Sequence, residues 1–120
     1  MPVISQTYPR LTAYSEENFQ GRTGIYRGNL GIANLDSRIG GIESLRFYST
    51  NSNATLVLFS RTGFRGAYRI YRSNVGLRDL EDLVSGEDAE SLISTNANLT
   101  NAQIQAIRSS GRLPSGYRRL

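Results

Sequence analysis

The chain has 120 residues and a formal net charge of +4, contains no Cys, His or Trp, and carries Arg at all 14 of its basic positions. Without Cys, His or Lys it lacks thiol and amine nucleophiles, the commonest general base and the usual transition-metal ligands, so catalysis would have to rest on carboxylates, hydroxyls or a bound ion. The length suits one domain with a modest core, and no disulfide can support it.

The first residues lack a basic segment followed by an apolar run, and no apolar run in the chain approaches the length of a membrane span. We therefore expect a soluble protein without an export signal, located in the cytoplasm. A secreted protein whose signal peptide has been removed would have the same features.

Short strand-like segments alternate with clusters of Gly, Asn, Asp and Ser in the first part of the chain. The predicted strands are residues 11–14, 24–27 and 44–49. In the last of them Leu45 and Phe47 alternate with Arg46 and Tyr48, as in a strand with one buried face.

The second part of the chain repeats the first. Residues 11–31 align without a gap with residues 56–76 at an offset of 45, and residues 43–45 align with residues 90–92 at an offset of 47. The two extra residues belong in a loop. The predicted counterpart strands are residues 55–59, residues 68–72 and a strand from Ser91. Two copies of such strands predict an all-β sandwich of two small sheets, and a duplicated hairpin in another β architecture is the alternative.

A short helix is predicted after the second copy. Thr100 can cap its start, and Ile104 and Ile107 share one face. Arg108 suits the negative C-terminal end of the helix, and Gly111 can end it. This segment lies outside the repeat.

The last segment, residues 112–120, contains Pro114 and Gly116 and is expected to be irregular. Ten Arg and ten acidic residues precede residue 100, so the whole net charge comes from the arginines after it. These are Arg108, Arg112, Arg118 and Arg119. A basic tail on a neutral body suggests contact with a polyanion; a solvated tail or a plug across one end of the sandwich are the alternatives.

The repeated aromatic and glycine positions resemble the signature of the βγ-crystallin family. Each copy has two aromatic residues separated by four others, then one residue and a Gly, and a Ser further on. These positions are Tyr14, Phe19, Gly21 and Ser44 in the first copy and Phe59, Phe64, Gly66 and Ser91 in the second. The resemblance implies two Greek-key motifs, in which the Gly takes a positive φ in a folded hairpin, the aromatics pack on that hairpin, and the Ser hydroxyl ties it to the sheet.

With this resemblance, the chain divides into a βγ-crystallin-like domain at residues 1–99 and a C-terminal helix with an Arg-rich tail at residues 100–120. The first motif spans about residues 10–50 and the second about residues 55–96.

The resemblance also implies a hypothesis about calcium. Microbial members of the family commonly bind Ca²⁺ through an Asn/Asp-Asn/Asp-x-x-Ser/Thr-Ser stretch in each motif, and each ion is clamped by both motifs. The corresponding stretches are residues 40–45, which have Gly at both acidic positions, and residues 87–92; the final Ser is Leu in both. The remaining candidate ligands are Asp88, Glu87, Ser44 and Ser91. We expect either no cofactor or one weakly bound Ca²⁺, held by Asp88 with Ser44 as the hydroxyl from the other motif.

The function predicted from these features is that of a non-catalytic structural or stress-related protein, because the acidic residues cluster in loops without a paired geometry across a cleft. One alternative is a module that binds a polyanion, a glycan or a protein partner, or a second copy of itself, through Arg-rich strand faces or the tail. Another is an inhibitor or toxin-like protein. On the strand predicted at residues 68–72, Arg69 and Tyr71 share one face and Tyr68, Ile70 and Arg72 the other, which works against a continuous nucleic-acid surface there.

Overall fold

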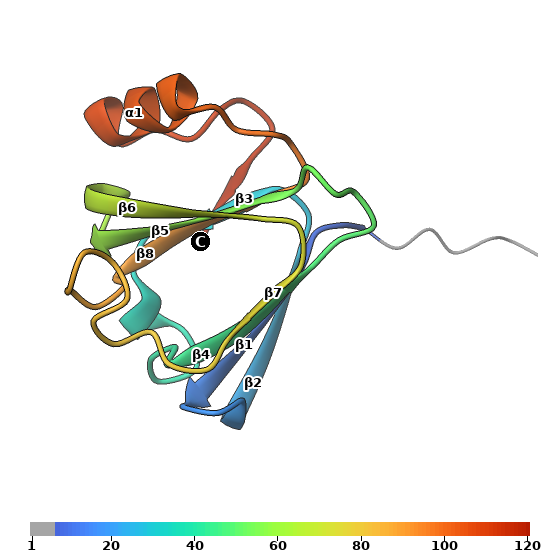
Figure 1. Ribbon diagram of the computed structural model, residues 1–120, viewed down its shortest axis with the longest axis vertical. Helices are drawn as coiled ribbons and strands as arrows, with labels where there is room; N and C mark the ends of the chain where they lie inside the picture. The colour runs from blue at the N-terminus through green and yellow to red at the C-terminus, as the bar shows by residue number, and fades with distance from the viewer. Residues whose placement is uncertain (1–6) are drawn as a thin grey trace, which may run out of the picture.

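The computed structural model describes residues 7–120, and within this range the chain is mostly short strands (Figure 1). The elements are β1 (Arg10–Glu16), β2 (Gln20–Arg27), β3 (Leu30–Ile32), the 3-10 turn η1 (Leu35–Ser37), β4 (Ser44–Tyr48), β5 (Thr55–Arg61), β6 (Arg65–Arg72), β7 (Val75–Leu77), β8 (Ser91–Thr95), α1 (Asn101–Ser110) and β9 (Arg118–Arg119).

The strands form two sheets that face each other, with α1 on the outer side of one of them (Figure 1). The four-stranded sheet has the order β2-β1-β4-β7, and the five-stranded sheet has the order β6-β5-β8-β3-β9. The third strand of each copy crosses to the other sheet, because β3 pairs with β8 and β7 pairs with β4. Each sheet therefore needs strands from both copies. The predicted all-β sandwich with two Greek-key motifs is confirmed.

The repeat in the sequence is also a repeat in strand register. Tyr14 pairs with Thr23 in the first hairpin and Phe59 pairs with Tyr68 in the second, and both ladders shift register within the next two residues. The second strand of each hairpin begins a few residues earlier than the sequence suggested, because pairing continues past this irregularity. The two hairpins have therefore kept the same irregularity at the same place.

The turn of each hairpin is tied to the neighbouring strand by one serine. The hydroxyl of Ser44 accepts a hydrogen bond from the backbone N–H of Phe19 (3.0 Å) and donates one to the carbonyl of Glu16 (2.6 Å). The same two bonds recur in the second copy, where Ser91 takes the place of Ser44 (3.1 and 2.6 Å). Both hydroxyls are fully buried, so these bonds satisfy groups that would otherwise be costly to bury.

The aromatic pairs of the two signatures pack in the same way. The ring centroids of Tyr14 and Phe19 lie 5.7 Å apart and those of Phe59 and Phe64 lie 6.0 Å apart, both close to edge-to-face. This is a favoured geometry for aromatic pairs and adds to the energy of burying their area.

Two signature glycines make the folded hairpins sterically feasible. Gly21 and Gly66 have φ angles of 82° and 83°, as predicted from the sequence. A Cβ at either position would collide with the hydroxyl of Ser15 or Ser60 respectively. Glycine is therefore required here for its backbone conformation and for its lack of a side chain.

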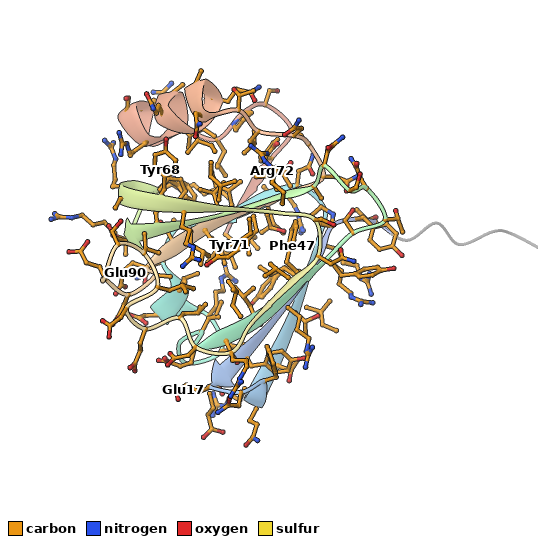
Figure 2. The ribbon with its side chains drawn as sticks, in the orientation of Figure 1. Glu17, Phe47, Tyr68, Tyr71, Arg72 and Glu90 are labelled. Atoms are coloured by element: carbon orange, nitrogen blue, oxygen red, sulfur yellow. The ribbon has the colours of Figure 1, made fainter. Side chains whose placement is uncertain are left out.

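The main hydrophobic core lies between the sheets. Its fully buried large side chains come from both copies: Leu11, Leu30, Ile32, Leu35, Leu45, Leu56, Leu58 and Leu92, with Phe47 almost as completely buried. Figure 2 shows Phe47 and Tyr71 directed between the sheets. Alternation along β4 and β6 places these residues inside and their sequence neighbours outside.

The C-terminal helix follows the sequence prediction. Thr100 forms a capping box with Gln103, and the helix ends at Gly111, which has a φ of 70°. Ile104 and Ile107 are buried. Within residues 7–120, no helix has both the length and the apolar character needed to cross a membrane.

A second hydrophobic cluster lies under α1, on the outer face of the five-stranded sheet. It joins the two helix isoleucines to Val57, Phe59 and Ile93, with Tyr68 packed against them. Tyr68 and Tyr71 therefore lie on opposite faces of β6, as the strand period requires (Figure 2).

The expectation that residues 112–120 are irregular is wrong for their last part. Arg118 and Arg119 form β9, which pairs in parallel with β3 and adds an edge to the five-stranded sheet. The N–H of Leu120 donates to the carbonyl of Gly31 (2.8 Å), and the carbonyl of Leu120 accepts from Ala33 (3.0 Å). Pro114 and Gly116 only shape the connection that precedes this strand.

The tail arginines are also not a free cationic arm. Three of them donate to backbone carbonyls: Arg108 to Gly66 (3.1 Å), Arg119 to Gly111 (2.8 Å) and Arg118 to Arg27. Among the described residues, the tail is thus part of the sandwich, which corresponds to the plug alternative.

Candidate functional site

The strongest concentration of acidic side chains lies where the loops of the two copies meet at one end of the sandwich. A cavity of about 60 Å³ opens there. It is lined by Asp36, Glu43, Glu81, Asp88 and Glu90, together with Ile42, Leu80 and Ala89. Figure 2 shows Glu90 at this loop end. We call it the acidic pocket.

The acidic pocket is built from repeat-equivalent positions. Asp36 corresponds to Glu81 at the offset of 45, and Glu43 corresponds to Glu90 at the offset of 47. The first copy therefore brings a carboxylate from η1 and the second from the turn after β7, and each copy brings one from the residue before β4 or β8. The pocket therefore has approximate twofold symmetry, because the two motifs contribute equivalent pairs of carboxylates.

Backbone hydrogen bonds hold the two halves of the pocket together. The N–H of Leu35 donates to the carbonyl of Glu90 (2.9 Å), and the N–H of Leu80 donates to the carbonyl of Glu43 (3.0 Å). Each bond crosses from one copy to the other. The backbone of each glutamate is therefore held by a hydrogen bond from the opposite motif.

Burial and mutual repulsion disfavour the charged forms of these carboxylates. Partial burial, followed by the carboxylate of Glu81, raises the pKa of Glu43, and partial burial, followed by Asp36 and Asp88, raises the pKa of Glu90. A cation or a proton in the pocket would relieve both effects.

A further acidic cluster adjoins the pocket on the exposed surface. Carboxylate oxygens of Glu17, Asp79 and Glu81 lie within 4.8 Å of one another. The carboxylate of Asp79, and then that of Glu17, raises the pKa of Glu81. Glu81 therefore belongs both to the pocket and to this exposed cluster.

Of the four residues predicted as metal ligands, the structure places only Asp88 in the pocket lining. Its Oδ1 accepts a hydrogen bond from the N–H of Asp82 (3.0 Å). Glu87 is exposed and does not line the pocket, and Ser44 and Ser91 are buried in the hairpin contacts described above. The hydroxyl of Ser44, expected as the partner ligand of Asp88, is engaged in the hairpin hydrogen bonds and does not line the pocket.

The structure also corrects the alignment of the loops. Ser44 and Ser91 tie the hairpins, which makes them the last Ser of the family stretch, whereas Leu45 and Leu92 are fully buried core residues. The assignment of that last position to the leucines was off by one residue. Glu43 and Glu90 then occupy the preceding Ser/Thr position, so a carboxylate stands in each motif where the family pattern has a hydroxyl.

Sequence reasoning missed Asp36, Glu43, Glu81 and Glu90 as pocket residues. Their signal was present in the repeat, because an acid occurs at each of these positions in both copies. Five of the eight lining residues carry carboxylates, the oxygen ligands that hard cations such as Ca²⁺ prefer. The lining offers no amine, thiol or imidazole group.

No family model and no curated protein matches this sequence. Solved structures do match it. Spherulin 3a from Physarum polycephalum has a TM-score of 0.55 and 17% identity, with 82% of this chain and 95% of that chain covered. A domain from work on the evolution of the eye lens βγ-crystallin fold has a TM-score of 0.54 and 19% identity, covering 78% and 93%. This chain has the βγ-crystallin fold. The fifth crystallin domain of the non-lens protein Absent in melanoma 1 has a TM-score of 0.51 and 17% identity, with 78% of this chain and 94% of that chain covered. At these identities the similarities establish the βγ-crystallin fold alone.

Proposed function

We propose that this protein is a non-catalytic, structural or stress-related βγ-crystallin-like protein whose two motifs meet at a weak Ca²⁺ site in the acidic pocket. The observation that carries the proposal is the repeat-equivalent set of carboxylates, which both motifs direct into one small cavity. An ion there would contact both motifs and favour the assembled sandwich over the unfolded chain.

The affinity is expected to be low. The first loop supplies no carboxylate at Ile39, Gly40 or Gly41, and the signature hydroxyls are already used inside the hairpins. The lining carboxylates are at least partly exposed, so water competes for them. These features point to the weakest class of Ca²⁺ modules, with a Kd of about 10⁻⁴ M or weaker. The inhibitor or toxin-like alternative gains no support from the solved structures.

Calorimetric titration with CaCl₂ tests the site. We expect at most one weak site, lost in Asp88→Ala and in Glu90→Gln and retained in Glu87→Ala, because Glu87 is outside the pocket lining. At ten times Kd the ion should stabilise the fold by only about 1.4 kcal/mol. Two tight sites, or a site indifferent to Asp88→Ala, would contradict this assignment.

The raised pKa values of Glu43 and Glu90 predict a pH dependence of stability. Each group binds protons more readily when folded than when unfolded, so its unfavourable contribution is absent below the ordinary pKa of 4.5 and grows as the pH rises through the higher folded value. The double variant Glu43→Gln, Glu90→Gln should therefore melt at a higher temperature than the wild type at pH 7.

This advantage should shrink as the pH falls toward 4, where the wild-type carboxylates become protonated. Thermal melts from pH 4 to pH 8 measure the difference, with Glu87→Gln as a control that removes one carboxylate outside the pocket lining. An advantage of the double variant that is the same at every pH would show that neither burial nor repulsion raises the pKa of these carboxylates.

A further inference from the structure

The outer face of the four-stranded sheet is the counterpart of the face that α1 covers, but α1 lies on the other side of the molecule (Figure 1). Strand register gives the outward side chains of its two central rows. One row contains Arg27, Arg10 and Tyr48, and the next contains Ile25, Thr12, Arg46 and Gly76. Neither row contains an acidic residue. We call this surface the arginine face.

The arginine face is not built to receive an apolar helix. Where the covered sheet has Val57 and Ile93, the repeat-equivalent positions of the arginine face are Thr12 and Arg46. The first copy thus carries a polar and a cationic side chain at positions where the second copy carries two buried ones. Of its apolar side chains, Ile25 (57%) and Tyr48 (37%) are the exposed large hydrophobics among the described residues.

Within residues 7–120, no backbone carbonyl accepts a hydrogen bond from the side chains of Arg10, Arg27 or Arg46, in contrast to those of the tail arginines. Arg10 stands directly opposite Arg27, an arrangement that disfavours the free protein, and Nη1 of Arg27 is buried with no hydrogen-bond partner among the described residues. Arg10 lies over the ring of Tyr48 (4.9 Å from Cζ to centroid) and Arg46 over that of Phe19 (3.8 Å). The guanidinium groups of Arg10 and Arg46 therefore lie against aromatic rings.

Two shallow cavities extend the face on either side. One of about 370 Å³ is lined by Arg10, Arg46, Tyr48 and Asn74 among others, and one of about 750 Å³ is lined by residues that include Arg27, Arg118 and Tyr26. No acidic residue lines either cavity. The two cavities together are lined by four arginines, and Tyr48 is the exposed tyrosine among their lining residues.

We propose that the arginine face binds single-stranded nucleic acid. Arginines on neighbouring strands can contact successive phosphates, and the exposed part of the Tyr48 ring, beside Arg10 (4.9 Å) and Tyr8 (5.8 Å between centroids), can stack on an unpaired base, as in sequence-tolerant single-strand binders. A duplex hides its bases and would use the charge alone. The arginines contribute phosphate contacts, and Tyr48 provides the stacking surface.

Fluorescence anisotropy with a labelled 12-nucleotide oligo(dT) at low salt tests the proposal on the full chain. The triple variant Arg10→Gln, Arg27→Gln, Arg46→Gln should weaken binding at least tenfold and reduce the slope of log K against log salt by about 2, since each phosphate contact on a single strand contributes about 0.7. The matched control Arg61→Gln, Arg65→Gln, Arg112→Gln removes the same charge elsewhere and should leave the slope nearly unchanged.

Stacking separates a single-strand site from a general polyanion patch. Tyr48→Ala should weaken oligo(dT) binding roughly tenfold, and a duplex or heparin should compete poorly. Equal binding of duplex or heparin, no effect of Tyr48→Ala, or an equal loss in the control variant would overturn the proposal. Melting curves check that each variant is folded, and Arg27→Gln alone serves as a milder variant if the triple variant does not fold.

Discussion

Deleting residues 112–120 is expected to destabilise the sandwich strongly. The deletion removes β9 and its backbone hydrogen bonds to β3, which include those of Leu120 with Gly31 and Ala33. It also removes the contact between the hydroxyls of Tyr117 and Thr95 (2.5 Å) and the side chain of Leu113, which packs under α1. At about 1 kcal/mol per hydrogen bond and with the lost apolar contacts, the free energy of unfolding should fall by on the order of 3 kcal/mol and the Tm by about 10 °C or more.

The matched control keeps the strand and removes its charge. Arg118→Gln, Arg119→Gln retains the backbone pairing of β9, so its Tm should stay much closer to that of the wild type than the Tm of the truncated chain does. Thermal and urea unfolding followed by circular dichroism measure both variants. A truncated chain that melts like the wild type would show that the tail is an independent appendage, as the polyanion interpretation of the sequence required.

The fold could be predicted from the sequence because the same pattern of strands and turns occurs twice in the chain. Phe19 and Phe64 are separated by the repeat offset of 45 residues and mark the same turn in the two copies. A turn that recurs with Gly at the same position predicts the same hairpin. The C-terminal helix could also be predicted, because the N-cap at Thr100 and the C-cap at Gly111 are signals in the local sequence.

The tail and the loops were harder because their structure depends on partners distant in sequence. The two-residue strand β9 forms because β3 has an open edge with which it can pair. No local sequence pattern at Arg118 or Arg119 predicts this strand. The alignment of the calcium-binding stretch was wrong by one residue, because it placed the last Ser position at Leu45. Only the hairpin hydrogen bonds show that Ser44 is the residue that ties the turn. The acidic pocket required knowing that loops of two copies meet.

Replacing Gly66 by Ala is expected to cost about 2–3 kcal/mol of unfolding free energy. A residue with a Cβ is disfavoured by roughly 1–2 kcal/mol at a φ of 83°. The new methyl group would also occupy the place of the Ser60 hydroxyl, which accepts a hydrogen bond from the N–H of Ala67 (2.9 Å). Displacing that hydroxyl adds about 1 kcal/mol. Gly21→Ala should behave alike, because its Cβ would meet Ser15, which accepts from Arg22 (2.7 Å).

Gly63→Ala separates the two causes. Gly63 lies in the turn of the same hairpin with a φ of 68°, but a Cβ there would meet no atom within 4 Å. Its substitution should therefore cost only the backbone contribution of roughly 1–2 kcal/mol, about 1 kcal/mol less than Gly66→Ala. Denaturant melts of the two variants compare these values directly. Equal losses would mean that the Ser60 hydroxyl moves aside without cost, and an unchanged Gly66→Ala variant would mean that the folded hairpin does not need its glycine.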